Sequence, residues 1–179
     1  MLKLTGGEHR GRNLKWLDIP GIRPTPARVR EAVFNIFSQE VADSQWWDLC
    51  CGSGVMGLEA LSRGAKSVTF VDQNRRSLDF LRQNLQTLKL QDQARIIGAN
   101  LGHFLKRQTE LNAQFIYCDP PYESALYRPV VEELGKMPLA QDITQVVMIL
   151  EYRKRHKSWE LCEPWQEVEQ RTYGDTCLS

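Results

Sequence analysis

The sequence predicts an α/β fold in which a mostly parallel sheet is covered by helices on both faces. From residue 46 onward, short apolar runs alternate with segments of helical periodicity. These runs occupy residues 46–51, 67–72, 94–99, 114–119 and 146–152. Strands buried on both faces of a parallel sheet are apolar along their whole length. Their alternation with helices is typical of units in which a helix connects two parallel strands.

The segments between these runs carry the helical pattern. Leu78, Leu81, Leu85 and Leu88 recur at helical spacing, and residues 126–137 form a second amphipathic segment. No long helix is expected after residue 152, where the pattern is strand-like at 158–162, 166–170 and 173–178.

The N-terminal residues predict a hairpin followed by a helix. Apolar residues alternate on both sides of a turn rich in glycine and arginine, residues 6–12. Thr25 is expected to cap a helix that has Pro26 in its first turn. The apolar face of this helix would contain Val29, Val33, Ile36 and Phe37. We expect residues 1–40 to form a basic extension and residues 41–179 the main domain.

Composition indicates one globular unit. The chain has 179 residues, of which 42% are hydrophobic and 25% charged. It contains neither an apolar run of membrane-spanning length nor a signal-peptide pattern at its start, so we expect a cytoplasmic protein without a membrane partner. The five cysteines include no CxxC pair, and neither they nor the three histidines predict a metal site.

Charge is unevenly distributed although the net charge is only +1. Residues 3–30 contain seven basic residues against two acidic ones. Arg28 and Arg30 lie off the apolar stripe of the predicted helix and are expected to face outward, and Arg10 and Arg12 lie in the turn of the hairpin. A basic extension of this kind favours a polyanion partner through phosphate contacts. A charged face that is simply solvated remains the alternative.

A glycine-rich segment follows the first strand and opens a helix. Gly52, Ser53 and Gly54 occupy the tight turn, where backbone can approach a ligand closely. Asp72 ends the next strand and is placed to bind a ribose diol. These features alone fit either NAD or S-adenosylmethionine (SAM). Asp48, just before the turn, favours SAM because an acid suits its methionine ammonium better than a pyrophosphate.

The tetrapeptide Asp119-Pro120-Pro121-Tyr122 ends the fourth strand of the parallel set. A carboxylate and a backbone carbonyl can accept both protons of an exocyclic amine, and an aromatic ring can stack on the base that carries it. The motif therefore predicts methyl transfer to a nucleobase nitrogen.

With these motifs the chain resembles the RsmD family of 16S rRNA guanine-N2 methyltransferases, within the class I SAM-dependent methyltransferases. The resemblance covers nearly the whole chain. It rests on residues 10–14, 23–25, 28–35, 48–65 and 119–122, in this order and spacing.

The resemblance implies a Rossmann-like class I methyltransferase fold with a seven-stranded, mostly parallel sheet and an N-terminal hairpin. It also implies that SAM is the cofactor and that the substrate is the N2 amine of one guanine in 16S rRNA, free or in a small subunit. Asn100 stands where the family usually has an aspartate for the adenine amine. Its amide oxygen could still accept that bond. We expect a monomer.

Two other functions remain open from the residues. A DNA adenine-N6 methyltransferase could use the same tetrapeptide, although 179 residues leave little room for a domain that reads DNA sequence. A non-catalytic RNA-binding or ribosome-assembly factor could retain the fold. The intact tetrapeptide argues against this last function.

Overall fold

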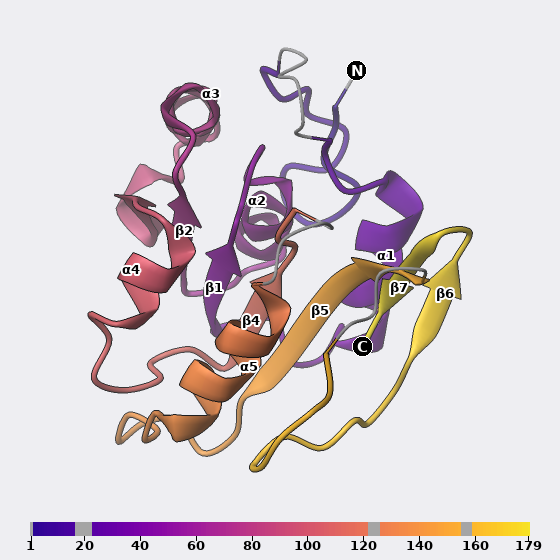
Figure 1. Cartoon of the computed structure of the whole chain (residues 1–179). Coiled ribbons are helices and arrows are strands. Elements are labelled where there is room, and N and C mark those ends of the chain that lie inside the picture. The colour runs from indigo at the N-terminus through magenta and orange to yellow at the C-terminus, as the bar shows by residue number, and fades with distance from the viewer. Residues whose placement is uncertain (1, 17–22, 122–125, 155–158) are drawn as a thin grey trace.

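A computed structural model describes residues 2–16, 23–121, 126–154 and 159–179. Its sheet has seven strands in the order β3-β2-β1-β4-β5-β7-β6 (Figure 1). Strands β1 to β5 are parallel, whereas β7 is antiparallel to both β5 and β6. The strands are β1 (Gln45–Leu49), β2 (Ser67–Asp72), β3 (Ala94–Gly98), β4 (Phe115–Cys118), β5 (Val147–Arg153), β6 (Arg171–Tyr173) and β7 (Thr176–Leu178).

Helices cover both faces of the sheet, as predicted. One hydrophobic cluster contains buried residues of α1 (Ala27–Ile36), α2 (Val55–Ser62) and α3 (Arg75–Leu88). A second cluster, on the other face, contains those of α4 (Leu101–Leu105) and α5 (Tyr127–Lys136). A short 3-10 helix, η1 (Gln91–Gln93), precedes β3. None of the helices in the described part of the chain has the length and apolar character that a membrane span needs.

The N-terminal extension packs into the main core. Leu4 and Leu14 belong to the same cluster as α1 and α2, and both are buried. The predicted hairpin is a single antiparallel bridge between Lys3 and Asn13, supported by the hydrogen bond from the Leu14 backbone N–H to the Leu2 carbonyl at 2.8 Å.

Three local expectations were wrong. Residues 159–162 and 166–170 form no strand, and the last two strands instead make a short hairpin around Gly174. Thr25 does not cap α1, whose N-cap is Pro26 without a side-chain hydrogen bond. The Thr25 side chain faces inward, and its hydroxyl lies 3.4 Å from that of Tyr117.

The order of the strands defines where a ligand can bind. The chain moves outward from β1 through β2 to β3, then returns to β4 on the other side of β1. At such a reversal the connections leave in opposite directions and open a crevice at the carboxyl ends of the strands. The glycine-rich turn after β1 and residues 119–121 after β4 both lie at this edge.

Candidate active site

The glycine-rich turn is a tight connection between β1 and α2. Gly54 is the N-cap of α2 and has a φ of 68°, in the left-handed region where a side chain is strained. Gly57 lies against β2, and a Cβ on it would be 2.3 Å from Cε1 of Phe70. Both glycines are therefore required for the close approach of α2 to the sheet, which leaves the turn at the edge of the crevice.

Asp48 lies beneath this turn. Its side chain is buried, and Oδ2 accepts a hydrogen bond of 2.9 Å from the Gly57 backbone N–H. The pKa of Asp48 is raised to about 8, chiefly by burial and in smaller part by the charge of Asp72, while the hydrogen bond from Gly57 acts to lower it. Asp48 thus holds the first turn of α2. Ser53 is also buried, and its hydroxyl accepts from the Val55 N–H at 3.3 Å.

Asp72 organises the turn from the end of β2. Its Oδ2 accepts from the Gly52 N–H and its Oδ1 from the Asn74 N–H, both at 2.7 Å. Each carboxylate oxygen has a second lone pair for a ligand hydroxyl. Asp72 is half-buried at the sheet edge, so the geometry suits the predicted ribose contact.

Asn100 has a structural role that the sequence reading did not include. It is the N-cap of α4, and its Oδ1 accepts from the Gly102 N–H at 3.0 Å. Its Nδ2 donates to Oε1 of Gln73 at 3.4 Å. The oxygen expected to meet adenine is therefore already in use, with one further lone pair available.

Asp119 and the two prolines extend β4 into the crevice. The Asp119 backbone N–H donates to the Leu49 carbonyl at 3.4 Å, which places the start of the tetrapeptide beside the end of β1. Pro120 is buried, and its carbonyl accepts from the Tyr127 hydroxyl at 3.3 Å. Pro121 is exposed, and Tyr122 lies outside the described residues.

Glu151 is a second buried acid at this edge, which the sequence reading did not select. It is 1% exposed, and Tyr117 on β4 donates its hydroxyl to Glu151 Oε2. The available signal was an acid near the end of the fifth apolar run, as Asp119 is at the end of the fourth. An acid at the end of an otherwise apolar strand is unusual enough to indicate a site.

The three acids have no ion-pair partner in the part of the chain that the structure describes. Among the described residues, no ion pair involves Asp48, Asp119 or Glu151. Burial raises the pKa of Asp119 well above its usual value, and the charges of Glu151 and Asp48 raise it further. Burial also raises the pKa of Glu151, against the hydrogen bonds from Tyr117 and Thr25. The crevice therefore favours ligands that bring hydrogen-bond donors or positive charge.

The four arginines predicted to contact RNA do not lie in one environment. Arg10, Arg12 and Arg28 are exposed. The expectation that Arg30 faces outward was wrong, because Arg30 is only 3% exposed and its Nη1 donates to Glu59 Oε1 at 2.7 Å. Helical spacing placed Arg30 off the stripe that meets the sheet, but α2 packs against that flank of α1.

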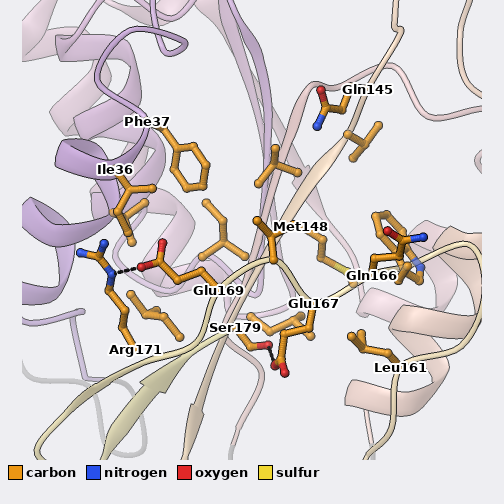
Figure 2. Close-up of a pocket in the computed structure, with 18 of the residues that line it drawn as sticks. Ile36, Phe37, Gln145, Met148, Leu161, Gln166, Glu167, Glu169, Arg171 and Ser179 are labelled. Carbon is orange, nitrogen blue, oxygen red and sulfur yellow. Dashed lines mark hydrogen bonds and ion pairs between the residues drawn. The ribbon is translucent and has the colours of Figure 1, made fainter.

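Two cavities are lined by residues of α1, β5 and the C-terminal segments. One, of about 340 Å³, lies between residues 23–29, the end of β5 and the β6–β7 hairpin, and Glu151 is among the residues that line it. The other, of about 260 Å³, is largely apolar and lies between α1 and β5, where Ile36 and Phe37 face Met148 (Figure 2). None of the predicted site residues lines this second cavity. In the described part of the chain, no cluster of three or more His, Cys, Asp or Glu side chains could hold a metal ion.

Comparison with known proteins supports the fold and the resemblance. A family model described as Conserved hypothetical protein 95 matches residues 2–179. Relatives in Escherichia coli (strain K12) and Haemophilus influenzae, both named Ribosomal RNA small subunit methyltransferase D, are 40% and 37% identical. Each alignment covers 74% of this chain, with 66% of the Escherichia coli protein and 70% of the Haemophilus influenzae protein.

A solved structure agrees over the full length. The yhhF protein of Escherichia coli superposes with a TM-score of 0.83 at 31% identity, covering 99% of this chain and 94% of its own. The predicted fold, a Rossmann-like sheet of the class I methyltransferase type, is confirmed.

Proposed function

The chain belongs to the family described as Conserved hypothetical protein 95, and we propose that it transfers a methyl group from SAM to the exocyclic N2 amine of a specific guanine in small-subunit (16S) ribosomal RNA. The observation that carries the proposal is the position of Asp119 and Pro120. They extend β4 beside the end of β1. Groups that can accept hydrogen bonds from an amine therefore lie next to the glycine-rich turn. The names of the relatives support rRNA as the substrate.

The residues at the crevice suit SAM. Gly52 and Gly54 let the backbone approach the methionine end, and Asp72 would accept from the ribose hydroxyls. Buried Asp48 lies beneath the same turn, where the charge of a ligand ammonium would favour its ionised form. When bound, SAM supplies an electrophilic methyl group on its sulfonium.

The chain's own contribution is to position and polarise the amine. The lone pair of a guanine amine is delocalised into the ring, so the nitrogen is a poor nucleophile. We propose that the Asp119 carboxylate and the Pro120 carbonyl accept its two hydrogens, which lets the nitrogen pyramidalise. Positive charge then grows on nitrogen beside buried acids, where electrostatic stabilisation is strongest. Asp119 can take the proton that the methylated nitrogen releases.

The position of the site at the sheet edge determines whether the target base can be paired in a helix. A base stacked inside a helix could not reach a crevice at the sheet edge, so the target guanine must be looped out or flipped. Tyr122 is proposed to stack on it. The exposed Arg10, Arg12 and Arg28 would bind flanking phosphates. We propose that a cytoplasmic monomer acts on 16S rRNA in an assembled or partly assembled small subunit.

One experiment tests this function directly. The protein is incubated with labelled SAM and, separately, with naked 16S rRNA, small ribosomal subunits and duplex DNA, and the labelled nucleoside is identified. We expect N2-methylguanosine from rRNA or from the subunits, and none with the Asp119→Ala variant. Label in DNA as N6-methyladenine, or in neither nucleic acid, would overturn the proposal.

A further inference from the structure

The 340 Å³ cavity beside Glu151 has the composition of a nucleotide pocket. Its walls come from three separate segments: residues 23–29 before and at the start of α1, the end of β5, and the β6–β7 hairpin. Figure 1 shows the hairpin lying alongside α1. Its charged and aromatic lining residues are Arg23, Arg28, Glu151, Arg153, Tyr173 and Asp175.

The outer part of this cavity can hold the sugar-phosphate and the face of a base. Arg23 and Arg28 are exposed cations, as phosphate contacts require. The guanidinium carbon of Arg28 lies 5.9 Å from the centre of the Tyr173 ring. Arginine planes and tyrosine rings are the surfaces on which unpaired bases stack.

The inner wall of the cavity contains Glu151, an acid that can accept hydrogen bonds from the edge of a base. Cys118 on β4 is paired with Leu150 on β5, so Asp119 and Glu151 follow at the same level of neighbouring strands. Alternation along β5 puts Glu151 on the face of Ile149, and Asp119 is the first residue after β4. The charge of Glu151 contributes to the raised pKa of Asp119, so the two carboxyl groups lie near each other at neighbouring strands about 4.8 Å apart.

Glu151 has unused acceptor capacity. A carboxylate offers about four lone-pair sites, and the hydroxyls of Tyr117 and Thr25 occupy at most two of them. Burial makes its ionised form costly, so donors from a ligand would be strongly favoured. Guanine offers adjacent donors, N1–H and the N2 amine, whereas adenine has an acceptor at N1 beside its amine.

From this arrangement we infer that Glu151 determines specificity for guanine by accepting the N1–H of the target base while Asp119 accepts from its N2 amine. The inference rests on the proposed function and adds the residue that selects the base. It also explains why the buried stretch of β5 contains a carboxyl group that has no ion-pair partner among the described residues.

The test compares guanine with 2-aminopurine, which keeps the N2 amine but has no N1–H. Small-subunit RNA carrying one or the other base at the position that the unaltered protein methylates is offered with SAM. The unaltered protein should strongly prefer guanine, because a site built around a donor rejects an analogue that lacks it. Glu151→Gln keeps an oxygen for Tyr117 and can turn an NH₂ toward N1. The preference should fall at least about tenfold, within the range for one good base contact.

Two further variants separate base reading from support of the fold. Glu151→Ala removes the acceptor whichever way an amide would turn, and it should lower the preference likewise. Tyr117→Phe removes the hydroxyl that holds Glu151 but leaves the carboxyl, and it should keep the preference. Thermal unfolding and SAM binding are measured for each variant to confirm folding.

The outcomes distinguish this inference from the function on which it rests. If the unaltered protein methylates no guanine in small-subunit RNA, the proposed function fails. If it does, and the folded Glu151 variants slow both bases equally and keep the preference, Glu151 is only structural and the inference is overturned.

Discussion

Arg30 and Glu59 form a buried ion pair that joins α1 to α2. Arg30 Nη1 lies 2.7 Å from Glu59 Oε1, with side chains 4% and 0% exposed. The same guanidinium donates to the Lys3 carbonyl at 2.8 Å, and Glu59 also accepts from Arg63 and from the Thr5 N–H and hydroxyl. One carboxylate therefore connects the hairpin, α1 and the helix that follows the glycine-rich turn.

Arg30→Ala should destabilise the protein by about 3 kcal/mol, because removing one partner leaves a buried charge underpaired. Urea unfolding at neutral pH measures the loss. Arg28→Ala, two residues earlier and exposed, is the matched control and should change the free energy of unfolding little. Equal effects of the two variants would contradict the assignment of Arg30 to the core.

Asp119→Ala should abolish methyl transfer and leave SAM affinity within a few fold, since the carboxyl is assigned to the amine and not to the cofactor. Calorimetric titration with SAM and a single-turnover assay on rRNA measure the two properties separately. Turnover close to that of the unaltered protein would remove Asp119 from the mechanism.

Asp72→Ala should weaken SAM binding by about 1.5 to 3 kcal/mol, the range for hydrogen bonds to a charged group. The variant also releases the Gly52 and Asn74 N–H groups, so the turn itself loses support. Asp79→Ala, on the exposed side of α3, is the control. Unchanged SAM affinity would exclude a ribose contact.

Asp48 should make the free protein less stable as pH rises from about 4 to about 8. In this window its folded pKa of about 8 keeps it protonated, while in the unfolded chain, with an ordinary value of 3.8, it ionises. The unfolded state thus binds fewer protons, and the free energy of unfolding falls with pH. Asp48→Asn should flatten this slope, because an amide does not ionise in this range, and its oxygen can still accept from the Gly57 N–H. Urea titrations at several pH values without SAM would show it, and parallel slopes would refute it.

Changing Arg10 and Arg12 together to Ala should weaken rRNA binding and flatten its salt dependence. Each lost phosphate contact removes roughly 0.7 to 0.9 from the slope of log affinity against log salt. SAM affinity should not change. Lys66 and Arg95, exposed near the amino ends of β2 and β3, provide the control pair. The same slope for both double variants would mean that the basic turn is only solvated.

The central sheet could be predicted because its strands are buried on both faces. The runs around Trp46, Phe70 and Ile116 are apolar along their length. Each run therefore predicts a strand without reference to the rest of the sequence. The last strands lie at the sheet edge, where exposure removes that pattern. The sequence therefore predicts a strand at residues 166–170, whereas β6 is Arg171–Tyr173.

The sequence indicates those parts of the candidate site that belong to a local motif, and it does not indicate those that depend on contacts between distant segments. Gly52, Asp72 and Asp119 each lie at or just after the carboxyl end of a strand, and parallel strands bring these ends to one edge. The inward position of Arg30 depends on Glu59, 29 residues later, and cannot be read from the periodicity of its own helix. The position of Glu151 beside Asp119 follows only from the pairing of β4 with β5.

The attachment of the basic hairpin to Glu59 has a consequence for engineering. The hairpin cannot be grafted from one relative to another as an independent module, because its backbone is held by a side chain of the catalytic body. A chimera that exchanged residues 1–40 without a compatible residue at position 59 would bury an unmatched charge. Exchanging the hairpin between homologues therefore requires moving α2 with it.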